Sequence, residues 1–140
     1  MPDSSHVGRR YAAAGQVVDA DRLRRFAAAI AGDDPVAADL GAVPPTFAAV
    51  YCLFPTLGSM FGDADLGIRL DGMVHAEQEF TWHAPVAPGD TLDSVATIAG
   101  VAEKRGRTFL TLHLETTRQE TRETVLTGRT LLLLATEPAR

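Results

Sequence analysis

The stretch TFAAVYCLFPTLGSMF, residues 46–61, decides the fold. Its large apolar residues recur at helical intervals and the positions between them are also mostly apolar, so the pattern predicts a helix that its neighbours bury on all sides. Thr46 follows two prolines and is predicted to cap the amides of the first turn. Pro55 removes one amide and crowds the preceding turn, which predicts a kink or break before the helix resumes toward Phe61.

The chain before this helix divides into four parts. The first eight or so residues are polar and are predicted to be a frayed terminus. Tyr11 to Val18 are predicted to be a short extended segment. Apolar residues recur at helical spacing from Asp19 to Gly32, which predicts a first helix there. Residues 33–45 contain three prolines and are predicted to form a loop. The predicted boundaries are a flexible tail over 1–10, one domain over 11–136 and a second tail over 137–140.

The chain after the helix alternates between strand and turn patterns. The predicted strands cover 73–83, 91–102, 107–118 and 124–135, and the last three are close enough in sequence to form an antiparallel meander. One buried helix and a long antiparallel sheet predict an α+β domain in which the sheet curls around the helix. The edges of such a sheet can pair with another copy or another subunit.

The predicted strand VHAEQEFTWH, residues 74–83, carries a polar residue on an apolar face. Strict alternation places Gln78 on the same side as Phe80 and Trp82, and it places His75 on the opposite side. A buried amide needs hydrogen-bond partners, so Gln78 is predicted to bind the first amides of the helix, at Thr46 and Phe47. Direct contact of Gln78 with a ligand is the alternative.

Composition excludes several classes of protein. A formal net charge of −5 and a pI near 5.2 argue against a nucleic-acid partner. The longest apolar run, Leu131–Ala135, is far shorter than the roughly 20 residues that cross a membrane. The single cysteine, Cys52, cannot form an internal disulfide and is predicted to act as a small buried hydrophobe. We therefore expect a cytoplasmic protein with no membrane span.

An ordered series of short motifs identifies a family. FAAAIAGD at 26–33, VPPTF at 43–47, HAEQEF at 75–80, PGDTL at 88–92, EKRG at 103–106 and GRTL at 128–131 follow one another along the chain. This series resembles the MaoC-like dehydratases, and more narrowly the branch called the N-terminal MaoC-like or FAS1-like dehydratase domain. The resemblance implies a hot-dog fold, in which a long central helix is wrapped by a curved antiparallel sheet and two such units join their sheets.

The resemblance also implies chemistry on acyl thioesters of coenzyme A or acyl carrier protein, with water added or removed across the C2–C3 bond. Active members carry Gly-Asp-x-Asn-Pro-x-His-x-Asp after the first helix, where the Asp and His act as acid and base. Here Asp33 matches the aspartate, but the histidine position falls on Ala37 or Ala38. Alanine cannot transfer a proton, and loss of one partner costs orders of magnitude in rate.

Three functional hypotheses follow. The first is the non-catalytic, substrate-binding half of a heterodimeric enoyl-thioester hydratase or 3-hydroxyacyl-thioester dehydratase. The second is a self-sufficient homodimer that uses Asp33 with His75, whose strand neighbours Glu77 and Glu79 are acidic. The third is an acyl-CoA-binding protein without chemistry. The expected substrate-binding residues are the following: Pro45, Thr46, Phe47, Gln78 and Phe80.

The remaining polar residues give no sign of a metal centre. His6 lies in the predicted tail, His83 near a turn and His113 in mid-strand, and none has a partner at the spacing of metal ligands. We expect no metal and no cofactor beyond the carrier of the acyl group. The expected partners are acyl-CoA or acyl carrier protein and a second hot-dog subunit.

Overall fold

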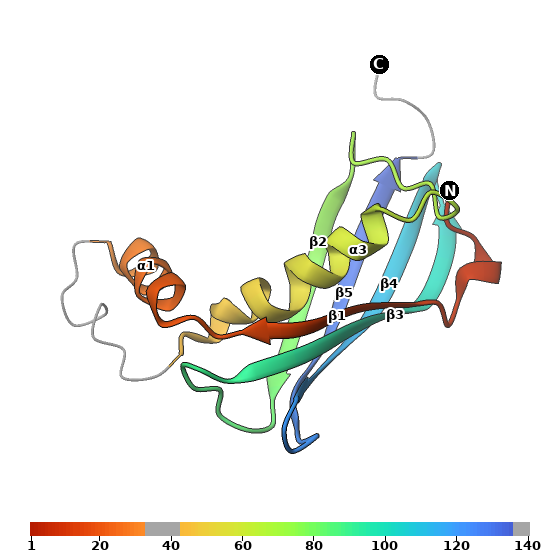
Figure 1. Ribbon diagram of the computed structural model, residues 1–140. Coiled ribbons are helices and arrows are strands. Elements are labelled where there is room, and N and C mark those ends of the chain that lie inside the picture. Colours follow the sequence, from red (N-terminus) through yellow and green to blue (C-terminus); the bar gives the residue numbers. More distant parts are fainter. Residues whose placement is uncertain (33–42, 136–140) are drawn as a thin grey trace.

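The computed structural model describes residues 1–32 and 43–135. A helical segment lies across one face of a five-stranded antiparallel sheet that curves around it (Figure 1). The strand order is β1-β3-β4-β5-β2. The predicted α+β architecture, a central helix wrapped by a curved antiparallel sheet, is confirmed.

The strands lie close to their predicted positions. Strands β3, β4 and β5 form the predicted meander, while β1 pairs with β3 at one edge and β2 pairs with β5 at the other. The strand bounds are β1 Arg10–Val17, β2 Val74–Trp82, β3 Thr91–Lys104, β4 Arg107–Arg118 and β5 Thr124–Ala135. The short turns predicted around residues 105 and 121 connect the last three strands, and Arg105 and Arg122 adopt positive φ in them.

The core lies between the central helix and the inner face of the sheet. Alternate residues of β4 are buried, as are alternate residues of β3, because successive side chains of a strand point to opposite faces. Leu110, Leu112 and Leu114 are at most 2% exposed and pack with Met60 of the helix in one cluster. This packing fixes the helix over the middle of the sheet.

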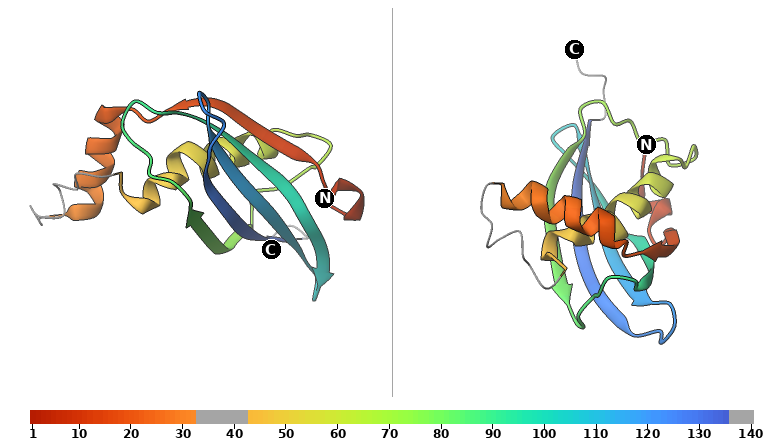
Figure 2. Two further views of the ribbon diagram at one scale, coloured as in Figure 1. Left: turned by 90° about the horizontal axis from the view of Figure 1, so that it is seen from below. Right: turned by 60° about the vertical axis from the view of Figure 1, so that its left-hand side comes forward.

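Helix α1 (Ala20–Ala31) confirms the first predicted helix. The Asp19 carboxylate accepts a hydrogen bond from the Arg22 amide at 2.9 Å and so caps the first turn. Gly32 ends the helix with a φ of 58°, a value that glycine adopts without strain. Figure 2 shows α1 at one end of the curved sheet, beside the start of the central helix, where Phe26 meets the Phe47 ring edge-on at 5.3 Å.

The central helical segment runs without a break from Pro45 to Phe61. It consists of a 3₁₀ turn, η2 (Pro45–Phe47), a π-helical turn, η3 (Ala49–Leu53), and helix α3 (Phe54–Phe61). The predicted cap is wrong: Thr46 lies inside η2, Pro44 precedes the turn, and no side chain caps it. The irregularity predicted at Pro55 takes the form of the wide π turn just before it.

The π turn has a local cause in Pro55. Proline has no amide hydrogen, so it cannot donate to the Tyr51 carbonyl four residues earlier. The Ser94 hydroxyl of β3 donates to that carbonyl at 3.0 Å instead, and Ser94 also bonds to the Thr116 hydroxyl at 2.7 Å. The freed carbonyl is therefore satisfied by the sheet, and this bond ties the helix to the middle of β3.

The N-terminal residues differ from the frayed terminus that the sequence predicts. Residues Ser4–His6 form a 3₁₀ turn, η1, capped by Asp3, and His6 is buried. The Gly8 amide donates to the Ile98 carbonyl at 2.8 Å, which continues the edge of the sheet. The terminus is ordered because these backbone groups find partners in β3. The domain boundary predicted at 136 lies outside the described residues.

In the part of the chain that the structure describes, no helix is long and apolar enough to cross a membrane.

Candidate functional site

A hollow of about 400 Å³ opens beside the start of the central helix. We call it the helix-start hollow. It is lined by Val43, Pro44, Pro45, Tyr51, Trp82, His83, Ala84, Pro85 and Val86. Three elements build it: the proline-rich entry to the helix, the π turn, and the end of β2 with the segment that follows. Most of these side chains are apolar, so the hollow suits an apolar ligand with few polar groups.

Tyr51 and Trp82 bring hydrogen-bonding groups to this apolar wall. Tyr51 is 3% exposed and its ring lies 6.2 Å from that of Phe47. Burial raises the pKa of the Tyr51 phenol to about 12, and a hydrogen bond from the Trp82 indole opposes part of that rise. The sequence places Tyr51 only among the residues of a buried helix. The signal for its special position is Pro55, four residues later.

The predicted substrate-binding residues at the helix start separate into three environments. Pro45 lines the helix-start hollow, Thr46 is exposed, and Phe47 is buried in the core at 2% exposure. The Phe47 amide donates to the Pro44 carbonyl at 2.9 Å, and the Ala48 amide donates to the Pro45 and Thr46 carbonyls. The turn thus uses most of its own amides. Contact of these residues with a substrate remains a prediction.

Gln78 does not bind the helix start. Its side-chain oxygen accepts a hydrogen bond from the Thr130 hydroxyl at 2.7 Å and lies 3.2 Å from His75 Nε2, while its amide group donates to the Glu79 carbonyl. The predicted tie to the amides of Thr46 and Phe47 is therefore wrong. The neighbouring strand β5 offers a buried hydroxyl nearer than the helix, and Gln78 uses it.

A β-bulge overturns the predicted placement of His75. In the pairing with β5, His75 faces Leu132 and Glu77 faces Leu131, so Ala76 is an extra residue on β2. Leu132 and Thr130 are both buried on the inner face, and cross-strand partners share a face. His75 therefore lies on the inner face with Gln78. Strict alternation predicts the opposite because it counts Ala76 as an ordinary strand residue.

Phe80 continues the inner face of β2 toward the helix-start hollow. Its ring lies 5.8 Å from that of Trp82, which lines the hollow, and it faces Gly128 across the strand pair. A Cβ at Gly128 would come within 2.7 Å of the Glu79 carbonyl oxygen and 3.0 Å of the Phe80 ring. Glycine is required at 128 for β2 and β5 to pair this closely, which accounts for the glycine of the GRTL motif.

Asp33, Ala37 and Ala38 lie outside the described residues, so the structure does not test a site built on them. His83, by contrast, lines the helix-start hollow, and its Nε2 is 2.7 Å from the Thr127 hydroxyl on β5. Cys52 is fully buried, as predicted, and burial raises the pKa of its thiol. Within residues 1–32 and 43–135, no cluster of His, Cys, Asp or Glu could hold a metal ion.

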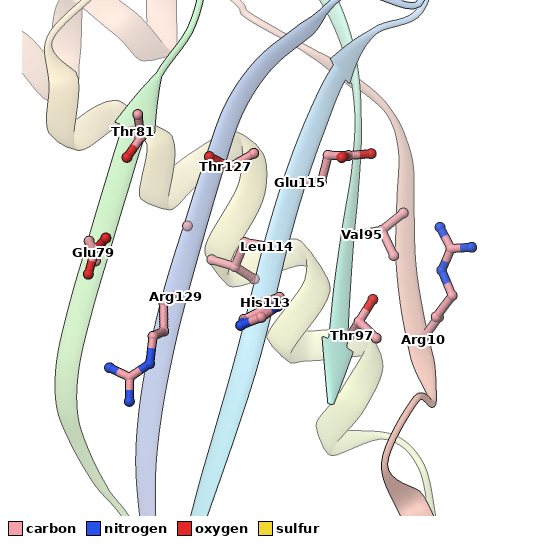
Figure 3. A pocket seen from close by; sticks show the side chains of 11 residues that line it. Arg10, Glu79, Thr81, Val95, Thr97, His113, Leu114, Glu115, Thr127 and Arg129 are labelled. Carbon is pink, nitrogen blue, oxygen red and sulfur yellow. The ribbon is translucent and has the colours of Figure 1, made fainter. Parts of the chain in front are cut away.

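A second hollow, of about 570 Å³, lies on the outer face of the sheet (Figure 3). One row of residues crosses all five strands there, with Arg10, Thr97, His113, Arg129 and Glu79 as successive cross-strand neighbours. Arg129 forms an ion pair with Glu77 at 2.8 Å. Arg10, Arg129, Glu79 and Glu115 are among the residues that line it, so charges of both signs lie on this open face.

A long helix packed on the inner face of a five-stranded antiparallel sheet defines a hot-dog protein. The pattern of the family described as "FAS1-like, dehydratase domain region" matches residues 5–127, and the chain belongs to that family. A UPF0336 protein of Saccharopolyspora erythraea is 32% identical in an alignment that covers 95% of this chain and 92% of the relative.

Solved structures of dehydratases share the fold. A chain of the HadBC complex, a 3R-hydroxyacyl-ACP dehydratase of Mycobacterium tuberculosis, superposes with a TM-score of 0.75 at 25% identity, covering 91% of this chain and 96% of that one. A MaoC-like dehydratase of Rhodospirillum rubrum gives a TM-score of 0.65 at 22% identity, covering 95% and 94%. Family and fold support a function of the dehydratase type.

Proposed function

We propose that this chain is the substrate-binding, non-catalytic subunit of a heterodimeric hot-dog enzyme that hydrates enoyl thioesters or dehydrates 3-hydroxyacyl thioesters. The observation that carries the proposal is the pair Ala37 and Ala38 where active relatives place the catalytic histidine. Asp33 alone cannot act as both acid and base. A partner subunit with both residues supplies the chemistry, and this chain supplies part of the acyl pocket.

The helix-start hollow supports the binding role. Its apolar lining suits an acyl chain, and it lies at the start of the central helix, beside the expected substrate-binding residues Pro45, Thr46 and Phe47. The substrate is carried as a thioester of coenzyme A or acyl carrier protein, and the reaction needs no other cofactor. The chain and its partner act in the cytoplasm.

Strand β2 supports the pairing with a second subunit. In the described sheet β2 is an edge strand, bonded to β5 on one side only. Three large apolar side chains near this edge and on the helix are strongly exposed: Phe54 at 64%, Val74 at 49% and Trp82 at 45%. An edge strand flanked by exposed apolar groups favours extension of the sheet by another hot-dog subunit.

One observation favours a second candidate, the self-sufficient homodimer. The bulge at Ala76 turns His75 to the inner face, where Gln78 and Thr130 hold it in a hydrogen-bonded chain. A histidine that faces the helix side could replace the missing base. In that case Asp33 and His75 form the acid/base pair, and two copies of this chain form the dimer.

Hydration of crotonyl-CoA distinguishes the candidates. The chain is assayed alone, and again after co-expression with the hot-dog protein of the neighbouring gene if that protein carries Gly-Asp-x-Asn-Pro-x-His. We expect no turnover by the isolated chain and full activity of the complex, unchanged by His75→Ala. Activity of the isolated chain that is lost in His75→Ala would instead establish the homodimer. If the chain binds the thioester but neither the chain alone nor its complex with a partner hydrates it, the third hypothesis, an acyl-CoA-binding protein without chemistry, is supported.

A further inference from the structure

Tyr51 is a buried polar side chain in the apolar helix-start hollow. An indole N–H can only donate, so the contact with Trp82 uses the phenol oxygen of Tyr51 as the acceptor. Among residues 1–32 and 43–135 the structure shows no acceptor for the phenolic proton. Tyr11, the other tyrosine, differs because its hydroxyl donates to the Asp63 carboxylate at 2.8 Å. Tyr51 thus has a hydrogen-bond donor to offer to a ligand.

The Tyr51 phenol remains a donor at neutral pH. Burial raises its pKa to about 12, so the proton stays on the oxygen throughout the physiological range. A neutral donor in an apolar pocket recognises a carbonyl or hydroxyl oxygen without the cost of burying a charge.

The backbone at the helix start provides few donors of its own. Pro44 and Pro45 have no amide hydrogen, and the amides of Phe47 and Ala48 bond to carbonyls within the turn. Within this turn, among the described residues, only the Thr46 amide has no hydrogen-bond acceptor. The Thr46 amide is therefore the one backbone donor that this turn leaves to a ligand, and a second donor at the hollow has to come from a side chain.

The position of Tyr51 is fixed from three sides. Ser94 holds its carbonyl, Phe47 contacts its ring, and the π turn that contains it precedes Pro55. Single π turns inside helices are frequent at functional sites, because they redirect side chains that a regular helix would place elsewhere. Such fixing lowers the entropy that Tyr51 loses when a ligand binds.

We propose that the Tyr51 hydroxyl donates a hydrogen bond to the carbonyl oxygen of an acyl thioester bound in the helix-start hollow. This inference rests on the proposed function and names the residue of this subunit that holds the reacting end of the substrate. Tyr51 is a ligand-binding residue on this view, and the partner subunit carries the proton transfer.

Two ligands that differ only in the carbonyl test the inference. Butyryl-CoA has the thioester carbonyl, and S-butyl-CoA, a thioether, lacks it. Calorimetry measures the binding of both to the chain, or to the complex with its partner, for the unmodified protein and for Tyr51→Phe. We expect Tyr51→Phe to weaken butyryl-CoA about tenfold, as the loss of one hydrogen bond predicts, and to leave S-butyl-CoA unchanged.

Tyr11→Phe is the matched control, because Tyr11 is buried and hydrogen-bonded but does not line the hollow. It should change neither affinity. If Tyr51→Phe melts like the unmodified protein and still prefers butyryl-CoA to the same degree, Tyr51 does not bind the carbonyl, and the proposed function stands without it. If the unmodified protein and its complex bind neither ligand, both the inference and the proposed function are wrong.

Discussion

The two ends of the central helical segment use a buried tyrosine in opposite ways. At the far end, the Tyr11 hydroxyl and the Arg9 guanidinium both bond to the Asp63 carboxylate just after α3, and Arg9 also bonds to Asp65. At the start, the Tyr51 phenol lies in the helix-start hollow, and no described residue accepts a hydrogen bond from its hydroxyl. At the far end, the Tyr11 hydroxyl has its acceptor within the protein, whereas at the start the Tyr51 hydroxyl can still donate a hydrogen bond to a ligand. We call the contacts of Asp63 with Tyr11 and Arg9 the anchor. The contrast distinguishes this anchor, which holds the fold, from a binding site at the other end.

The largest effect is expected at the start, from Ser94→Ala. The Ser94 hydroxyl is the donor that compensates the Tyr51 carbonyl for the missing amide of Pro55. Its removal leaves a buried carbonyl short of a partner, which costs about 1–3 kcal/mol. Urea unfolding should show this loss at pH 7. Unchanged stability would mean that another donor satisfies the carbonyl and that the π turn does not depend on the sheet.

Asp63→Asn breaks the anchor at the far end, and its effect depends on pH. Hydrogen bonds from Tyr11 and Arg9 lower the pKa of the Asp63 carboxyl from 3.8 to about 2. The charged form is favoured in the folded state, so its stabilisation is complete above about pH 4 and disappears as the pH falls toward 2.

The measurement for Asp63→Asn is the urea midpoint of both proteins between pH 2 and pH 7. We expect the substituted protein to be less stable at pH 7, and the two midpoints to converge in acid. If the two urea midpoints still differ at pH 2, the packing of the Asp63 side chain, and not its charge, stabilises the fold at this position. Asp71→Asn is the control, since its contact with Arg69 is long, at 3.9 Å, and solvent-exposed.

The smallest effect, and one of opposite sign, is expected for Thr108→Val. Among the described residues, the Thr108 hydroxyl is the buried side-chain group with no hydrogen-bond partner, and it is fully buried on the inner face of β4. Replacing it by a methyl group of similar shape should stabilise the fold by about 1 kcal/mol. Unlike Tyr51, Thr108 lines neither hollow. A thermal melt that shows destabilisation would indicate a hidden partner for this hydroxyl.

Much of the fold could be predicted from the sequence because its signals are local. The periodicity of residues 91–135 places three strands close to their observed bounds, and Asp19 and Gly32 mark the ends of α1. The order of the edge strands and the packing of the N-terminal turn depend on contacts distant in sequence. No local pattern in residues 1–9 indicates that Gly8 bonds to Ile98.

The candidate site was harder to predict, and the errors have two physical causes. One extra residue in β2, Ala76, moves His75 to the other face, and nothing in the composition of the strand marks it. The alternation of the strand predicts that Gln78 reaches the helix, but the Thr130 hydroxyl on β5 is its partner. In the sequence, Tyr51 is indistinguishable from a core residue, because it stands at helical spacing among apolar residues; only the π turn of the structure sets it apart.

The bulge at Ala76 also limits how another chain can add to the β2 edge. An open edge strand is a template on which further chains can add without limit. The extra residue interrupts the regular backbone of β2 after His75, so a partner finds an unbroken ladder only from Glu77 to Trp82. A short edge of this kind limits the length over which another strand can pair with β2.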